Sequence, residues 1–173
     1  MRSKSTHHTF SKTLLLFISL SLCLACARKV TNLESPVTHV PQMTFTIERD
    51  YKTTWNAVIR AVTDLPGHAI QSSVKRKGTI VVAPVTVTTA GYCDCGSIGK
   101  DRLTGPATRT TTVRLKRKSP PQTQIEVSCK YSTVYTWKDV YGNVVRTSSI
   151  ACASTGRFER ELHRSVMCYT QVQ

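Results

Sequence analysis

Five cysteines in the second half of the chain have the clearest potential for chemistry in this sequence. They are Cys93, Cys95, Cys129, Cys152 and Cys168. The first two form a C-x-C pattern around Asp94 and can join disulfides or bind a soft metal as thiolates. We favour a structural role, in which one of the pair bonds Cys168 and fixes its loop to the body of the protein. Because five is odd, we expect two bridges and one free thiol.

A metal or redox role is the alternative for the C-x-C segment. Closed zinc sites usually take four ligands in paired spacings, and the sequence has no second pair, although His163 or Cys168 could contribute. The familiar redox motif is C-x-x-C rather than C-x-C. We therefore expect no metal and no cofactor. A metal- or thiol-handling protein acting through Cys93-Asp94-Cys95 remains the alternative function.

The second predicted bridge follows from a hairpin. If residues 139–142 form its loop, Cys129 faces Cys152, and apolar residues face apolar residues along both strands. Directly opposed side chains have Cβ atoms about 4.5–5.5 Å apart, so slight adjustment would allow a disulfide. Two buried thiols packing as hydrophobes is the alternative, because free cysteine packs well in a core.

Basic residues cluster at two places. Lys75, Arg76 and Lys77 occupy a predicted turn, and Arg114, Lys116 and Lys118 alternate along a predicted strand. This pattern indicates an exposed basic stripe that could meet anionic headgroups or an acidic partner. A solvated face without a ligand is the other interpretation, since charge runs are usually solvated.

Catalytic signatures do not occur in the sequence. It contains no G-x-S-x-G, H-E-x-x-H or P-loop pattern. His39, His68 and His163 are scattered, without the nucleophile and carboxylate that a triad needs. We therefore predict that the protein is not an enzyme.

The elements that position these residues can be predicted from periodicity. Strands are expected at 42–47, 69–74, 79–87, 108–118, 125–137 and 144–153, because apolar or β-branched residues alternate there. Helical spacing predicts one helix from Asp50 or Thr53 to Pro66-Gly67, and a second that begins near Ser154 or Thr155. Residues 88–106 are expected to form a long loop. The fold class is α+β: a single antiparallel sheet of about five to six strands packed against two helices, in the order β-α-β-β-β-β-β-α.

The N-terminal segment has the form of a secretory leader. Arg2, Lys4 and Lys12 precede a short apolar run, which is too short to span a bilayer comfortably. The segment Leu22–Cys26 resembles the lipobox of bacterial lipoproteins, although Cys23 stands where that family usually has leucine. The resemblance implies cleavage after residue 25 and lipidation of Cys26, with palmitate among the acyl chains. We expect residues 1–25 to form the signal peptide, 26–41 a lipidated tether and 42–173 a single domain.

Charge limits the class of partner. The chain has 24 Lys and Arg against 10 Asp and Glu, and three of these bases leave with the leader, so the remaining chain carries a formal +11. Such a charge attracts anionic surfaces. We expect a location in the cell envelope, on the outer membrane facing the periplasm. We expect the membrane as a partner, through the N-terminal lipid. Anionic lipid, lipopolysaccharide or an envelope protein could be a further partner. Nucleic acid is not expected.

Two further segments carry a distant resemblance. The run Trp55–Ile59 with Lys77–Ile80, and the closing run Ser154–Glu159, resemble helix-grip domains of envelope lipoproteins, one example being the lipoprotein subunit of the outer-membrane β-barrel assembly machine. The resemblance implies a non-catalytic binding, assembly or scaffold module with a basic surface. The cysteines and the strong basicity depart from that pattern.

Overall fold

The computed structural model describes residues 33–34 and 43–171. The chain divides into two compact units, 1–32 and 33–173, and only the second contains described residues. The predicted signal peptide and the predicted lipidation site at Cys26 lie outside the described residues. Among the residues that are described, no helix is long and apolar enough to cross a membrane.

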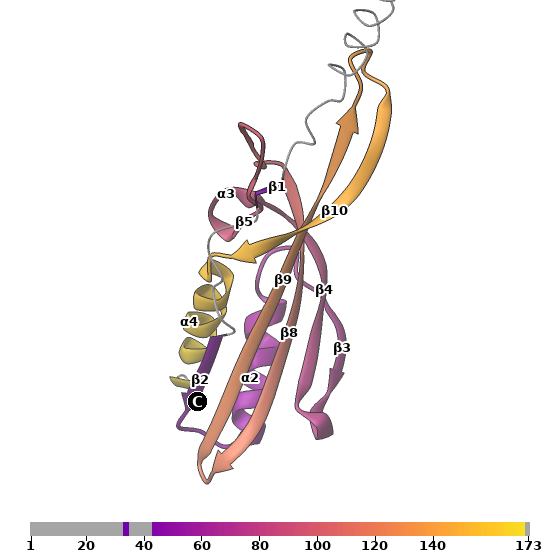
Figure 1. Cartoon of the computed structure of the whole chain (residues 1–173). Coiled ribbons are helices and arrows are strands. Elements are labelled where there is room, and N and C mark those ends of the chain that lie inside the picture. The colour runs from indigo at the N-terminus through magenta and orange to yellow at the C-terminus, as the bar shows by residue number, and fades with distance from the viewer. Residues whose placement is uncertain (1–32, 35–42, 172–173) are drawn as a thin grey trace, which may run out of the picture. The chain divides into compact units, whose positions relative to one another are not determined.

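The described unit is an α+β structure with one large antiparallel sheet, as the sequence predicts (Figure 1). The sheet has seven strands in the order β3-β4-β8-β9-β10-β5, and β2 also pairs with β9. The strands are β2 (Met43–Ile47), β3 (Ile70–Val74), β4 (Thr79–Thr88), β5 (Cys93–Asp94), β8 (Pro106–Ser119), β9 (Gln122–Lys138) and β10 (Val144–Ser154).

Strand β9 holds the sheet together because it pairs along its whole length. The first part of β9 pairs with β2, with Phe45 opposite Ile125, and its later part pairs with β10. Its other edge pairs with β8 from Gln122 to Thr133. Beyond that point, β9 and β10 continue as a two-stranded hairpin that extends past the other strands (Figure 1).

The two long helices begin where the sequence places local caps. Helix α2 (Tyr51–Thr63) follows Asp50, whose carboxylate accepts hydrogen bonds from the amides of Lys52 and Thr53. Helix α4 (Arg157–Gln171) follows Gly156, whose carbonyl accepts from the Arg160 amide at 3.1 Å. Ser154, one of the predicted caps, lies three residues before the first residue of α4, and its hydroxyl accepts from the Gly156 amide at 3.0 Å.

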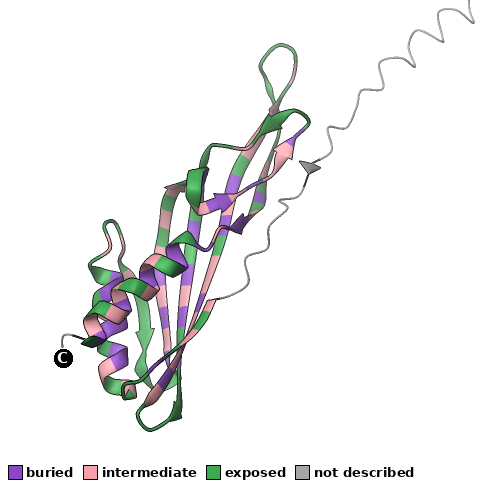
Figure 2. Cartoon of the chain, turned by 90° about the vertical axis from the view of Figure 1, so that its left-hand side faces the viewer, coloured by how far each residue is buried: buried purple, intermediate pink, exposed green. Residues whose placement is uncertain are grey.

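Both helices pack on the same face of the sheet, and the core lies between these two layers (Figures 1 and 2). From α2 and α4 come Val58, Val62, Phe158, Leu162 and Val166, all at most 1 % exposed. The sheet contributes residues that alternate along its strands: Ile80, Val82, Val113, Leu115, Ile125 and Val127. The alternation of buried and exposed residues in β8 confirms the predicted inward and outward faces.

The predicted long loop at 88–106 contains short elements. They are the kinked turn of helix α3 (Thr89–Tyr92), strand β5, and the strands β6 (Ser97–Ile98) and β7 (Asp101–Arg102). Strand β6 pairs with β1 (Leu33–Glu34), which falls inside the predicted tether. The predicted loop therefore contains short strands, which the sequence does not reveal because two-residue strands are too short to show a periodicity.

The predicted register of the β9–β10 hairpin is also wrong, by two residues. Cys152 lies opposite Tyr131, not opposite Cys129. One residue of the shift comes from the turn, in which the Asp139 carboxylate accepts from the amides of Tyr141 and Asn143. The other comes from an irregularity between Val144 and Arg146. A shift by two keeps every side chain on its face, so the apolar pattern could not detect it.

Candidate functional site

A basic groove forms where the turn between β3 and β4 meets the end of β8. The turn is the 3-10 helix η1 (Lys75–Lys77), and Gly78 closes it with φ +63°. The Gly78 carbonyl accepts a hydrogen bond from the Leu115 amide at 2.7 Å. A side chain could not fit at this position, because an added Cβ would lie 2.1 Å from the carbonyl oxygen of Leu115. Glycine therefore brings the two predicted basic clusters together.

The lining of this groove is strongly cationic. It has a volume of about 930 Å³ and no acidic residue in its lining. Its six basic residues are Lys52, Lys75, Arg76, Lys77, Lys116 and Arg117, and the rest are Tyr51, Gly78 and Leu115. Like charges held this close repel one another, so an anionic ligand would relieve the repulsion.

Tyr51 forms the aromatic wall of the groove. Its hydroxyl donates to the Lys75 carbonyl at 2.5 Å, and the Arg117 guanidinium carbon lies 5.0 Å from the centre of its ring. Burial raises the pKa of the Tyr51 hydroxyl, although the charge of Arg117 acts in the opposite direction. The tyrosine therefore remains a neutral hydrogen-bond donor that ties η1 to α2.

A second hollow adjoins the groove, and one carboxylate, that of Asp50, lies in its lining. The hollow has a volume of about 480 Å³, and Asp50, Lys118 and the turn at Pro120–Pro121 contribute to its lining. The Asp50 carboxylate is engaged at the start of α2, where hydrogen bonds from Thr53, first from its side chain and then from its amide, lower its pKa. This acid therefore caps a helix, and it makes no ion pair with a lysine in the described part of the chain.

The structure brings together most of the predicted basic residues. Lys75, Arg76, Lys77 and Lys116 share the groove, and Lys118 lies in the adjoining hollow. Arg114 lies outside both linings and pairs with Glu126 on the neighbouring strand at 3.8 Å. Lys52 and Arg117 were not predicted. The helix start after Asp50 and the approach of Gly78 to β8 place them there; Lys52 is an isolated base in the sequence, and Arg117 has the parity of the inward face with Val113 and Leu115.

The predicted disulfides need correction. The structure contains a Cys95–Cys152 bond, and Cys93, Cys129 and Cys168 are free. Cys129 lies opposite Thr111 of β8, with its sulfur 3.5 Å from the Thr111 hydroxyl oxygen, whereas Cys152 lies opposite Tyr131 and is bonded to Cys95. Cys168 is exposed on α4 and bonds neither Cys93 nor Cys95. The C-x-C loop is therefore fixed to the body through β10 rather than through α4.

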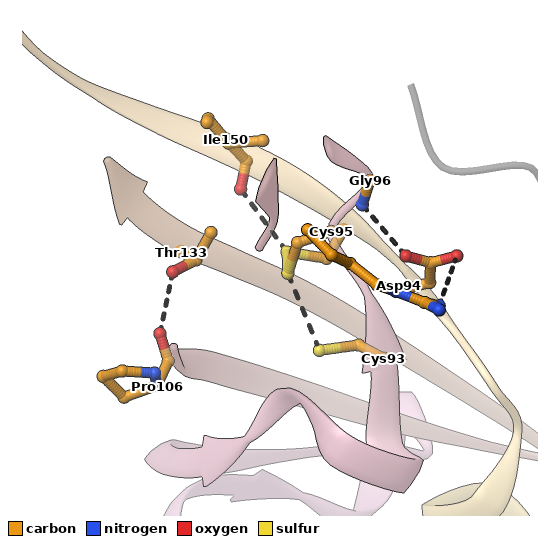
Figure 3. Close-up of a disulfide and its surroundings, with 9 residues drawn as sticks. Cys93, Asp94, Cys95, Gly96, Pro106, Thr133 and Ile150 are labelled. Carbon is orange, nitrogen blue, oxygen red and sulfur yellow. Dashed lines mark hydrogen bonds and ion pairs between the residues drawn. A yellow bond between two sulfur atoms is a disulfide. The ribbon is translucent and has the colours of Figure 1, made fainter. Parts of the chain in front are cut away.

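Three sulfur atoms gather where β5 pairs with β10 (Figure 3). Cys93 is opposite Ser154 in this pairing, and the same register continued places Cys95 opposite Cys152, with Cα atoms 4.1 Å apart. Cys93 and Cys95 lie on the same face because side chains two apart in a strand point the same way. Their sulfur atoms are 4.0 Å apart, and the sulfurs of Cys93, Cys95 and Cys152 all lie within 4.8 Å of one another.

A buried polar cluster lies under the start of α4. Arg109 of β8 is 2 % exposed, its guanidinium carbon is 3.6 Å from the centre of the Phe158 ring, and it contacts Nε2 of His68. Nδ1 of His68 lies 2.8 Å from the Pro66 carbonyl, so it carries the proton and Nε2 accepts from Arg109. Glu159 is 4 % exposed and accepts from the Ser154 hydroxyl at 2.8 Å. The sequence predicts none of this cluster.

A scan against protein-family models finds no match to this chain, and a search of curated protein sequences likewise finds none.

Proposed function

We propose that this chain is a non-catalytic, lipid-anchored protein of the bacterial cell envelope, whose basic groove binds phosphate-bearing lipid headgroups. The observation that carries the proposal is the groove lining, with six cations and no acid. Phosphate groups suit such a lining because Arg and Lys both recognise them, arginine by paired hydrogen bonds and lysine as a point charge.

The predicted leader and the groove support the same kind of protein. Several acyl chains together attach a protein firmly to a membrane, and a basic patch adds electrostatic attraction to anionic lipid. Each Lys or Arg near an anionic surface adds about 1 kcal/mol. We therefore propose lipidation at Cys26 and a location on the outer membrane facing the periplasm, with the groove as a second contact to anionic lipid.

The test of the groove is a vesicle-binding experiment with two matched triple variants. One reverses groove charges with Lys75→Glu, Lys77→Glu and Lys116→Glu. The control reverses three exposed lysines outside it with Lys100→Glu, Lys130→Glu and Lys138→Glu, so that both change the net charge equally. Each also carries Cys26→Ser, so that no acyl chain contributes to binding.

We expect the groove variant to bind vesicles containing phosphatidylglycerol about 100-fold more weakly than its parent, because it loses three contacts of about 1 kcal/mol each. The control should lose much less, and salt should weaken binding by the parent. Phosphatidylcholine vesicles carrying lipopolysaccharide distinguish the two headgroup sources. Equal losses in both variants would show a general charge effect and reject the groove as the site.

The anchor is tested separately by intact mass. Protein from a bacterial membrane fraction should start at Cys26 and carry acyl chains. An unacylated mass would reject the anchor, but it would leave the binding assay of the groove standing.

A further inference from the structure

We propose that reduction of the Cys95–Cys152 bond converts the three-sulfur cluster into a binding site for one Cu(I) ion, with Cys93, Cys95 and Cys152 as ligands. This inference goes beyond the proposed headgroup binding and does not depend on it. It rests on Cys93 of β5, on Cys95 directly after that strand and on Cys152 of β10, none of which lines the basic groove.

The spacing of the sulfur atoms fits a shared metal ion. Metal–sulfur bonds of about 2.3 Å in a trigonal three-sulfur site place the sulfur atoms about 4.0 Å apart. The Cys93 and Cys95 sulfurs are already 4.0 Å apart, and that of Cys152 lies within 4.8 Å of both. Once the disulfide is reduced, only the Cys95 and Cys152 sulfurs must separate.

The backbone holds this arrangement independently of the disulfide. β5 pairs with β10 through Asp94–Ala153 and Cys93–Ser154, and the Thr155 amide donates to the Tyr92 carbonyl at 3.0 Å. The Asp94 carboxylate accepts from the Gly96 amide at 2.9 Å and pairs with Arg102 at 3.6 Å (Figure 3). Asp94 therefore shapes the turn after Cys95, while the two sulfurs face Cys152.

The ligand set favours Cu(I) over Zn²⁺. Thiolates select soft ions such as Cu(I), whereas structural zinc takes four protein ligands. Among the described residues, the cluster contains three cysteines and no histidine or carboxylate. The two additional ligands considered from the sequence lie elsewhere: His163 packs on Phe45 with ring centres 4.2 Å apart, and Cys168 is exposed on α4.

Cys93 lies beside the disulfide and is only 5 % exposed, so a metal ion held there would be shielded from solvent. A coordinating thiol loses its proton when the metal binds.

Opening of the site requires a dithiol as the reductant. The dithiol supplies two electrons and two protons to the Cys95–Cys152 bond, becomes a disulfide itself, and leaves Cys95 and Cys152 as thiols. Cu(I) then replaces the thiol protons, which leave to solvent, and the oxidation state of copper does not change. In the oxidised protein two of the three sulfurs bond each other, so the site is closed.

The test is an anaerobic Cu(I) titration of the full-length protein against a chromophoric Cu(I) chelator, before and after reduction with a dithiol that is then removed. The variants are Cys93→Ser and the matched control Cys168→Ser. All forms retain Cys23 and Cys26, so a difference between them reports only the described cysteines.

We expect reduction of the wild-type protein to create one tight Cu(I) site with an ultraviolet thiolate-to-copper absorption. Cys93→Ser should weaken that site by at least about 100-fold, the upper range for removing even a supporting group, and Cys168→Ser should leave it unchanged. Equal affinity in Cys93→Ser and wild type would overturn the proposal, as would equal affinity before and after reduction.

A second measurement covers the case in which Cys93→Ser does not fold. X-ray absorption of the reduced, copper-loaded wild-type protein should show three sulfur neighbours around copper. Two sulfurs, or a mixture of sulfur with nitrogen or oxygen, would contradict the assigned ligand set.

Discussion

The free cysteines differ in their surroundings, and this difference predicts their reactivity. Cys168 is exposed, whereas burial, helped by the charge of Glu159, raises the pKa of Cys129 to about 12. Only the thiolate is alkylated. At about pH 8, below the ordinary cysteine value of about 8.5, the raised pKa leaves Cys129 roughly 1000-fold less thiolate than an ordinary cysteine.

We therefore expect iodoacetamide to label Cys168 first and Cys129 last, as followed by peptide mass spectrometry without reductant. Labelling of Cys129 should rise with pH, because its thiolate fraction grows until the pH reaches the raised pKa. Denatured protein, in which all free thiols should react alike, is the control. If Cys129 reacted as fast as Cys168 in the native protein, Cys129 would not be buried as described.

The buried charges of Arg109 and Glu159 should depend on each other. Both act on the same two buried groups, Cys129 and Tyr131, although no ion pair within 4.0 Å joins them in the described part of the chain. Arg109→Met removes a buried guanidinium that packs on Phe158 and contacts His68, and it should cost about 1–3 kcal/mol of unfolding free energy. Adding Glu159→Gln should restore about 1 kcal/mol or more. Urea unfolding of the single and double variants measures this coupling, and strict additivity would contradict it.

At the residue scale, charge and cysteine types were predictable, but their partners were not. The sequence marks Lys75–Lys77 and the alternating bases after Val113, and the structure confirms that they are exposed. Alternation also places Arg109 on the inward face of the same strand, but it cannot indicate that Phe158 is its partner. That contact joins residues 49 positions apart and depends on how α4 lies on the sheet.

At the scale of elements, Gly78 should be more sensitive than the other glycines in the left-handed region. Gly78→Ala combines the cost of φ +63° with a Cβ 2.1 Å from the Leu115 carbonyl oxygen. Gly67→Ala is a matched control, with φ +75° and no atom within 4 Å of the added Cβ. We expect Gly67→Ala to lower the unfolding free energy by about 1 kcal/mol, and Gly78→Ala to lower it by at least about 1 kcal/mol more.

Urea unfolding provides both values, and vesicle binding shows whether the groove is preserved in Gly78→Ala. Because the clash pushes η1 away from β8, binding should weaken along with stability. Equal unfolding free energies for the two variants would mean that the turn and the strand are not in contact.

Element positions were largely predictable, because each long element has its own periodicity. Helix α2 has its apolar stripe, a cap at Asp50 and a stop before Pro66-Gly67, and strands β4 and β8 alternate as expected. Pairing within the hairpin was not predictable, since the turn at Asp139 and the irregularity near Val145 displace the register without changing the pattern. The disulfide assignment was wrong for the same reason.

At the scale of the whole molecule, the Cys95–Cys152 bond should contribute substantially to stability. It joins residues separated by 57 positions and encloses β6, β7, β8, β9 and most of β10. Closing a loop of that size restricts the unfolded chain, and we expect reduction to lower the unfolding free energy by about 2–4 kcal/mol.

The measurement is urea unfolding with and without a dithiol, with Cys168→Ser as a control that should respond like the wild type. A Cys95→Ala, Cys152→Ala double variant should be insensitive to the dithiol. Reduction without effect on the wild type would show that the bond does not restrain the unfolded chain. Folded domains have an unfolding free energy of about 5–15 kcal/mol in total, so the reduced protein should remain folded.

The pairing of β2 with β9 has a consequence for the order in which the fold is completed. Phe45 leaves a ribosome or a translocation channel long before Ile125, its partner 80 residues later. Until β9 follows, β2 has no partner strand, and α2 has only part of the sheet on which to bury Val58 and Val62. Contacts so distant in sequence form slowly, and the exposed apolar surface promotes aggregation meanwhile. A chain that emerges N-terminus first therefore depends on protection of these early segments until β9 arrives.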